Sequence, residues 1–358
     1  MSNWYDILTC PLDGTGVVSF VIRQDEDGYD EGCLLCPKCE TLWSISHGIP
    51  RFVTAGNIDL NRDIDILKSL QSTVHGVSDS VIRRNVERLS RWHSNTKANW
   101  ERDEMSFWES DYSNRLTSEK MTYNRLFPRQ RHILNKLPSG INRVLELGCG
   151  HANTLFYDEQ FIRNKEYIGT DLSFNALRLA RTRLSGHYVL CDANALPFPD
   201  KYFDAVLGFG VLHHLHNREA ALEKCQRVLK CGGWLGFCEK LKTSDRIQSS
   251  RIVALAKRLF IGGSRQHEAL EFVDGGELLV LLRRICGNES TFYYDVGLMR
   301  DILVKLFVDY LRVNSRLVTR GVILLDEVSI RLLAPVTDFF APKQVTFVAQ
   351  KREADVPR

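Results

Sequence analysis

Val144-Leu145-Glu146-Leu147-Gly148-Cys149-Gly150 stands near the middle of the chain, and the surrounding sequence is organised around it. The apolar run favours a buried strand, and the glycines that end it predict a tight turn into a helix. Glycines at such a turn let a ligand approach the backbone closely. A second short strand, predicted at residues 167–170, ends in Asp171 about 20 residues further on. A doubly wound sheet places the acid that bonds ribose hydroxyls at this distance.

Two further predicted strands also end in polar or glycine positions. Residues 188–191 precede Asp192-Ala193, and residues 203–207 precede Gly208-Phe209-Gly210. In an open α/β sheet, ligands bind outside the carboxyl ends of the strands. The sequence therefore predicts an α/β fold with a ligand site along the ends of four consecutive strands.

Residues from about 140 to 240 resemble the class I S-adenosylmethionine-dependent methyltransferases. Six motifs agree with that family in order and spacing: 146–150, Asp171, 192–198, Phe203-Asp204, 211–215 and 229–233. One position departs, because His151 stands where the family often has another glycine. The resemblance implies a doubly wound, Rossmann-like sheet of seven strands, with residues 345–349 as its last, antiparallel strand. It also implies an enzyme that transfers a methyl group.

The resemblance implies a role for the glycine-rich turn. Gly148 and Gly150 would let the backbone pass close to the methionine portion of the cofactor S-adenosylmethionine. Glu146, at the end of the strand, would orient the ammonium group of that portion, directly or through water.

The later strand ends are expected to bind the nucleoside portion. Asp171 would accept hydrogen bonds from both ribose hydroxyls. Asp192 would accept from the adenine amino group, with the backbone of Ala193 beside it. Leu172 and Phe209 would flank the adenine or the methionine tail.

His213 and His214 are the candidate catalytic residues. Methyl transfer from a sulfonium is an in-line displacement, so the protein has mainly to orient two reactants. These histidines follow the fourth strand, near the expected acceptor, where an imidazole could take a proton from a hydroxyl or amine. The alternative is that paired histidines at this place only begin a helix, and both interpretations stay open.

Residues 1–55 are expected to form a separate small module with a structural zinc ion. Cys10, Cys36 and Cys39 have the spacing of a zinc ribbon, but Asp13 replaces the expected fourth cysteine. Residues 42–50 are similar to the closing strand and Gly-Ile-Pro tail of small zinc-ribbon domains that partner methyltransferases. We favour Asp13 as the fourth ligand, since Cys33 lies about 10 Å from Cys36 along an extended segment. Cys33 as ligand and a relict ribbon without metal are the alternatives.

Two segments are expected to supply helices. Residues 56–138 form a predicted helical linker and lid ahead of the domain at residues 139–358, with basic residues at 83–97 that suit a solvated face or, less often, phosphate. Trp108, Tyr112 and Tyr123 are candidate lid residues, with core packing as the alternative. A helical insertion at about 298–334 could cap a pocket, form a homodimer face or touch a membrane surface.

Composition gives only broad limits on the class of protein. The chain has 358 residues, 44% hydrophobic and 25% charged, and its net charge of +3 is too small to indicate a polyanionic partner. Without a recognisable secretory leader or a long apolar stretch, a cytoplasmic protein is expected. Cys149, Cys191, Cys225, Cys231, Cys238 and Cys286 are then most simply small apolar residues in a reducing compartment.

Two classes of function remain after these observations. The first is a methyltransferase for a small, largely apolar metabolite, through O- or N-methylation, for example in secondary metabolism. The second is an RNA or protein methyltransferase that uses the ribbon for docking. Residues 208–211 lack the Asn-Pro-Pro-Tyr-like tetrad that methylation of flat amino groups uses, which favours the first class.

Overall fold

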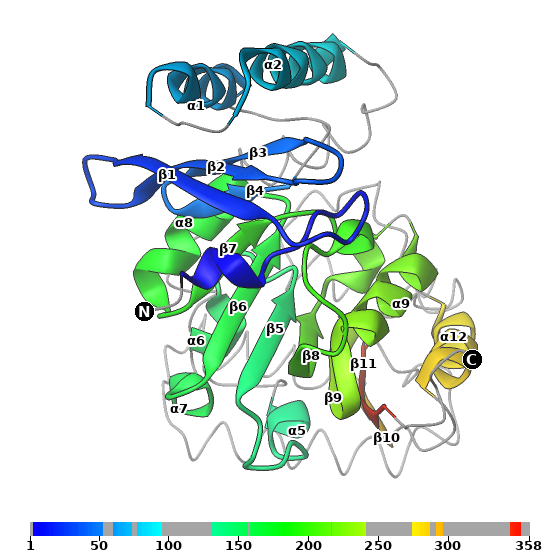
Figure 1. Ribbon diagram of the computed structural model, residues 1–358. Helices are drawn as coiled ribbons and strands as arrows, with labels where there is room; N and C mark the ends of the chain where they lie inside the picture. Colours follow the sequence, from blue (N-terminus) through cyan, green and yellow to red (C-terminus); the bar gives the residue numbers. More distant parts are fainter. Residues whose placement is uncertain are drawn as a thin grey trace, which may run out of the picture.

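The computed structural model describes residues 3–52, 60–73, 77–94, 131–156, 158–215, 217–240, 274–286, 291–295 and 344–351. Within these residues, one sheet of eleven strands runs in the order β1-β2-β3-β4-β7-β6-β5-β8-β9-β11-β10 (Figure 1). Figure 1 shows helices on both sides of its central part. The architecture is therefore α/β, as the sequence predicts.

Seven strands of this sheet have the predicted doubly wound arrangement. In spatial order they are β7 (His187–Leu190), β6 (Glu166–Asp171), β5 (Arg143–Leu147), β8 (Phe203–Phe209), β9 (Leu229–Lys240), β11 (Gln344–Gln350) and β10 (Thr291–Asp295). The first five are mutually parallel, whereas β11 is antiparallel to both β9 and β10. The prediction of a final antiparallel strand at 345–349 is thus confirmed.

The whole sheet is larger than the expected seven strands, because four N-terminal strands, which the sequence predicts as a separate module, extend it. These are β1 (Val18–Gln24), β2 (Asp30–Leu35), β3 (Leu42–Ser46) and β4 (Ile49–Arg51). They form an antiparallel meander whose last strand pairs in parallel with β7, at Arg51 and Leu190. The N–H of Phe52 adds a 2.7 Å hydrogen bond to the Leu190 carbonyl. An edge strand carries unpaired backbone groups, and the N-terminal meander satisfies those of β7.

Two apolar clusters cover the opposite faces of the parallel strands. On one face, α9 (Arg218–Val228) and α12 (Gly275–Cys286) pack with the 3-10 turns η3 (Ala193–Ala195) and η4 (Leu212–His214). On the other lie α5 (Arg131–Leu134), α6 (Asn153–Phe156), α7 (Glu159–Ile162) and α8 (Phe174–Arg183). Strands buried on both faces read as continuous apolar runs, which is why 144–147 was recognisable in the sequence.

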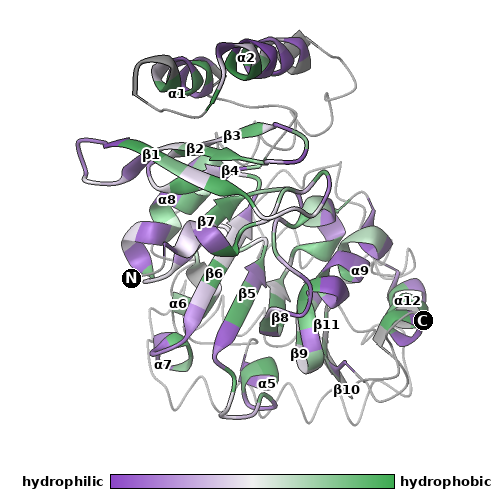
Figure 2. Ribbon diagram, viewed as in Figure 1, coloured by the Kyte–Doolittle hydropathy of each residue, from purple (hydrophilic) through white to green (hydrophobic). Residues whose placement is uncertain are grey.

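A third apolar cluster joins the N-terminal strands to two helices. It brings Cys33 and Leu42 against α1 (Leu60–Thr73) and α2 (Asp79–Ser94), through Leu67, Leu70 and Ile82. Figure 1 shows both helices beside β1 to β4, and Figure 2 shows hydrophobic and hydrophilic residues on each of them. Both of these segments are helices, and the role of residues 56–138 as linker and lid stays a prediction.

Several expected features lie outside the described residues. They are the lid candidates Trp108, Tyr112 and Tyr123, and the insertion at 298–334 with its expected pocket, homodimer or membrane role. Among the described helices, none combines the length and apolar character needed to cross a membrane.

Candidate active site and metal centre

The rim, defined as the turns that follow β5, β6, β7 and β8, begins with the glycine-rich turn. Gly148 and Gly150 have φ of +62° and +52°, a region that favours glycine. A Cβ on Gly148 would come within 2.4 Å of Cγ2 of Val211, so no larger residue fits there. The N–H of Cys149 donates to the Thr170 carbonyl at 2.9 Å and fastens the turn to β6.

His151, the departure from the family pattern, lies just after this turn and is half-buried. Burial, with a smaller contribution from the charge of Arg183, lowers the pKa of His151 to about 4. The imidazole is therefore neutral at physiological pH and adds no charge to the rim.

Asp171 links the glycine turn to the start of α8. Its Oδ2 accepts the N–H of Gly150 and its Oδ1 accepts the N–H of Ser173, both at 2.8 Å. Ser173 in turn caps α8 by accepting the N–H of Ala176 at 3.1 Å. A carboxylate oxygen can accept more than one hydrogen bond, so this fixed carboxylate suits ribose hydroxyls. Leu172, which follows it, is partly exposed.

The turn after β7 holds Asp192, Ala193 and a residue that the sequence did not single out, Asn194. Oδ1 of Asp192 accepts the backbone N–H of Asn194 at 2.8 Å and its side-chain N–H at 3.1 Å. Oδ1 of Asn194 is buried and has no hydrogen-bond partner among the described residues. A buried acceptor without a partner is uncommon and calls for a donor. The adenine amino group is a donor of the required kind.

Glu146 is shielded from solvent rather than displayed on the rim. It is 1% exposed and accepts the Tyr167 hydroxyl at 2.5 Å. Burial, with a smaller effect of the Asp171 charge, raises the pKa of Glu146 to about 8. Its role toward the ammonium group of a cofactor stays a prediction.

The turn after β8 carries Phe209, which is partly exposed, and the two histidines in η4. His213 is buried, and its ring centroid lies 4.0 Å from that of the less buried His214. Nδ1 of His213 lies 2.9 Å from Oε2 of Glu239, which is fully buried at the end of β9. Glu239 is not among the site residues predicted from the sequence. Its place at the end of the fifth parallel strand was the available signal.

The rim therefore fits the cofactor that the family resemblance implies. Separate strand ends contribute three features to the rim. These are the two glycines with positive φ, the Asp171 carboxylate held by backbone N–H groups, and the buried Asn194 oxygen that has no donor among the described residues. Gly148, Gly150 and Asp171 would hold the methionine and ribose portions, and Asp192 and Asn194 the adenine. When bound, S-adenosylmethionine supplies a methyl group on a positively charged sulfur.

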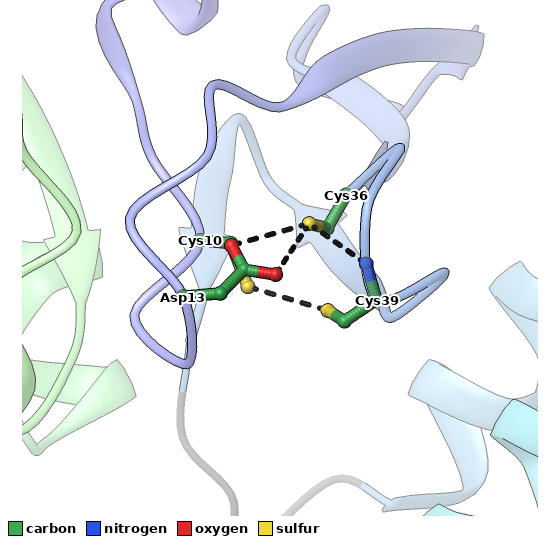
Figure 3. Close-up of side chains that lie close together, drawn as sticks. All are labelled: Cys10, Asp13, Cys36 and Cys39. Carbon is green, nitrogen blue, oxygen red and sulfur yellow. Dashed lines mark hydrogen bonds between the residues drawn. The ribbon is translucent and has the colours of Figure 1, made fainter.

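The four predicted metal ligands meet at one point between two loops (Figure 3). Sγ of Cys10 lies 3.7 Å from Sγ of Cys39, and Sγ of Cys36 lies 3.4 and 3.6 Å from the two oxygens of Asp13. Tetrahedral zinc, with Zn–S of about 2.3 Å and Zn–O of about 2.0 Å, requires S–S and S–O separations of about 3.7 and 3.5 Å. The donor set therefore fits zinc.

Local bonds preform both loops of this metal centre. The N–H of Cys39 points to Sγ of Cys36 at 3.5 Å, and the N–H of Thr15 donates to Oδ1 of Asp13 at 2.9 Å. The Thr15 hydrogen bond holds the pKa of Asp13 below its usual range. Asp13 is therefore ionised before any metal arrives.

Cys33, the alternative fourth ligand, does not join this group. Its side chain is fully buried in the apolar cluster beneath α1 and α2. Burial raises the pKa of the Cys33 thiol, as expected for a cysteine that packs as a small apolar residue.

Comparison with known proteins finds similarity to methyltransferases in the central part of the chain. Residues 145–237 match a family described as "Methyltransferase domain". The fatty-acid O-methyltransferase of Mycolicibacterium smegmatis is 36% identical over 115 residues, 31% of this chain and 42% of that protein. The ubiquinone biosynthesis O-methyltransferase of Nitrosomonas europaea is 27% identical over 204 residues, 53% of this chain and 82% of that protein.

A solved structure of low similarity covers a larger part of the chain. The phosphoethanolamine N-methyltransferase 2 of Haemonchus contortus aligns with 69% of this chain and 60% of its own, at 15% identity and a TM-score of 0.45. The chain spans less than half the length of the fatty-acid relative. The family match and the two relatives show similarity to methyltransferases in the central part of the chain and leave the acceptor undetermined.

Proposed function

We propose that this protein transfers the methyl group of S-adenosylmethionine to a small, largely apolar acceptor. The observation that carries the proposal is the convergence of Gly148, Gly150, Asp171 and Asn194 on one rim, beside the turn that holds His213. The turn that holds His213 lies against the glycine turn, so a buried imidazole is near the rim that would hold the methyl donor. Relatives named for a fatty acid and for ubiquinone biosynthesis support an apolar acceptor and O-methylation.

RNA or protein methylation is the second candidate. A relative from Arabidopsis thaliana, 33% identical over 113 residues, is named a tRNA (carboxymethyluridine(34)-5-O)-methyltransferase. The basic residues of α2 offer less free charge than the sequence suggests, because Arg84 pairs with Glu40 and Arg88 donates to the Leu42 carbonyl at 2.9 Å. Because these arginines already have partners within the protein, the structure favours a small-molecule acceptor over the phosphate backbone of RNA.

The cofactor half of the proposal is tested by calorimetric titration. Asp171→Ala removes a charge-assisted acceptor and should weaken S-adenosylmethionine binding by about 1.5–3 kcal/mol, roughly 10- to 150-fold. Asp6→Ala, at an exposed aspartate of η1, is the control and should bind like the wild type. Unchanged affinity in a folded Asp171→Ala protein would refute the ribose assignment.

The acceptor half is tested with radiolabelled S-adenosylmethionine. Label should enter an organic-soluble fraction when long-chain or aromatic acceptors are supplied, with little sensitivity to moderate salt. Label in RNA, with binding that weakens steeply as salt rises, would instead establish the macromolecular alternative.

We also propose that Cys10, Asp13, Cys36 and Cys39 hold one structural zinc ion. The agreement between their mutual distances and a tetrahedral site supports this assignment. Protein purified without chelator should contain about one equivalent of zinc, and Cys36→Ser should lose it. Cys231→Ser, at an exposed cysteine outside the group, should keep it. Wild-type protein that contains no metal would contradict this proposal and indicate that the N-terminal module is stabilised by its apolar residues alone.

A further inference from the structure

Glu239 is a fully buried carboxylate whose hydrogen bonds all go to one turn. Oε1 accepts the backbone N–H groups of Val211 and Leu212, each at 2.8 Å, and Oε2 faces Nδ1 of His213 at 2.9 Å. Among the described residues, no lysine or arginine forms an ion pair with it. A buried charge is costly unless it is fully hydrogen-bonded. The two backbone N–H groups donate to Oε1, so Oε2 has the imidazole of His213 as its hydrogen-bond partner.

This contact determines which nitrogen of a neutral His213 carries the proton. An ionised carboxylate only accepts hydrogen bonds, so the ring nitrogen that faces it must be the donor. A neutral ring with its proton on Nδ1 has its lone pair on Nε2. A base whose second nitrogen is held by a carboxylate is the arrangement that activates hydroxyl groups in many unrelated enzymes.

The turn that carries His213 lies directly against the glycine turn. Leu147 of β5 is in register with Gly208 of β8, and the position of a Cβ on Gly148 is 2.4 Å from Val211. His213 follows Val211 by two residues and is only 6% exposed. The turn that carries His213 therefore lies beside the turn expected to bind the methionine portion of the cofactor, and the imidazole is largely shielded from water.

We propose that Glu239 is a positioning residue that fixes His213 with its proton on Nδ1, so that Nε2 serves as general base for a hydroxyl acceptor. This inference rests on the proposed function and narrows its substrate class to alcohols or phenols. The acceptor O–H gives its proton to Nε2 while an oxygen lone pair forms the bond to the methyl carbon. The carbon–sulfur bond breaks, and its electron pair stays on the sulfur. A carboxylic acid, already ionised at neutral pH, needs no such base.

Glu239→Gln is the decisive variant because it keeps the size of the side chain. The amide oxygen can still accept from Val211 and Leu212, but the amide NH₂ then faces Nδ1 and requires the lone pair there. Nitrogen-15 correlation spectra of histidine-labelled protein, with the His213 signal assigned from its loss in His213→Gln, should show the proton on Nδ1 in the wild type and on Nε2 in Glu239→Gln. His214→Gln is the control and should leave the His213 signal in the wild-type pattern.

Turnover provides the second measurement. With a panel of phenols and long-chain alcohols, Glu239→Gln and His213→Gln should each lose about 10²- to 10⁴-fold in kcat, the usual contribution of a general base. Calorimetric affinity for S-adenosylmethionine should change little in both variants. If Glu239→Gln does not fold, the test relies on a folded His213→Gln protein. Loss of its turnover supports His213 as general base, and wild-type turnover overturns that role.

The outcomes separate this inference from the proposed function. A proton on Nε2 in the wild type, or a Glu239→Gln variant with wild-type proton position and turnover, overturns the inference alone. Methylation of carboxylic acids but not of alcohols or phenols also overturns it while the methyltransferase assignment stands. A wild-type protein that binds no S-adenosylmethionine refutes the proposed function itself.

Discussion

At the scale of single residues, the two buried glutamates of the central domain differ in how many donors they receive. Among the described residues, the Glu239 carboxylate has three hydrogen-bond partners in one turn, whereas the Glu146 carboxylate has one, the Tyr167 hydroxyl. Burial consequently raises the pKa of Glu146 to about 8. The sequence predicts that both residues end strands, but not their partners. Tyr167 lies on the neighbouring strand and the backbone of Val211 lies in another turn, so the contacts arise only in the assembled sheet.

Replacing Glu146 with glutamine should stabilise the protein at alkaline pH. Between the ordinary value of 4.5 and about 8, the unfolded carboxyl loses its proton while the folded one keeps it, so the wild type loses stability as pH rises. Glu146→Gln removes this cost and can still accept from Tyr167. Its advantage should be small near pH 5 and reach about 4 kcal/mol near pH 8.

Thermal melting without cofactor at several pH values measures this difference. Glu223→Gln, at an exposed glutamate of α9, is the matched control and should show no such trend. A Glu146→Gln advantage that is equal at pH 5 and pH 8 would contradict the prediction.

At the scale of elements, the apolar spacing predicts α2 correctly but says little about its charges. Asn85 accepts the N–H of Leu42 at 3.0 Å and donates to the Glu40 carbonyl at 2.9 Å. Arg88 donates to the Leu42 carbonyl and lies over the Trp43 ring, 5.2 Å from its centroid. These partners directly follow Cys39, so α2 packs on the second metal loop. Contacts over more than forty residues cannot be read from helical periodicity.

Asn85→Ala should therefore destabilise the N-terminal part of the chain. The variant leaves the buried N–H of Leu42 and the Glu40 carbonyl without their partner, which costs about 1–3 kcal/mol. Arg91→Ala removes an exposed pair with Glu87 on the same helix and should cost at most about 0.5 kcal/mol. Urea unfolding measures both values. Equal stability of the two variants would show that α2 is held by its apolar face alone.

At the scale of the whole molecule, the N-terminal strands and the central domain share one apolar core. Tyr5, Trp43 and Phe52 belong to the same buried cluster as Val189 and Leu196. The cysteine spacing within residues 1–55 indicates a self-contained module and does not predict this contact. The pairing of β4 with β7 joins residues far apart along the chain through a single bridge, for which sequence pattern provides no signal.

Polar and aromatic contacts reinforce the same junction. The ring of Trp4 stacks on His187 with centroids 4.3 Å apart, and the N–H of Thr9 donates to the Pro197 carbonyl at 3.0 Å. Arg181 donates to the His47 carbonyl and lies over the Tyr29 ring. Because Pro197 follows the turn of Asp192 and Asn194 closely, the N-terminal residues support the part of the rim that we propose binds adenine.

Removing the N-terminal strands should therefore damage the central domain rather than release it intact. A protein that begins at residue 53 would expose the edge of β7 and part of a shared core, which favours aggregation. We expect it to be poorly soluble or to bind S-adenosylmethionine much more weakly than the full chain, and co-expression of residues 1–52 as a separate chain should restore both properties. Size-exclusion chromatography and calorimetric titration measure these effects. A monomeric fragment with the cofactor affinity and melting temperature of the full chain would contradict this prediction. It would show that the central domain folds and binds its cofactor without the N-terminal strands.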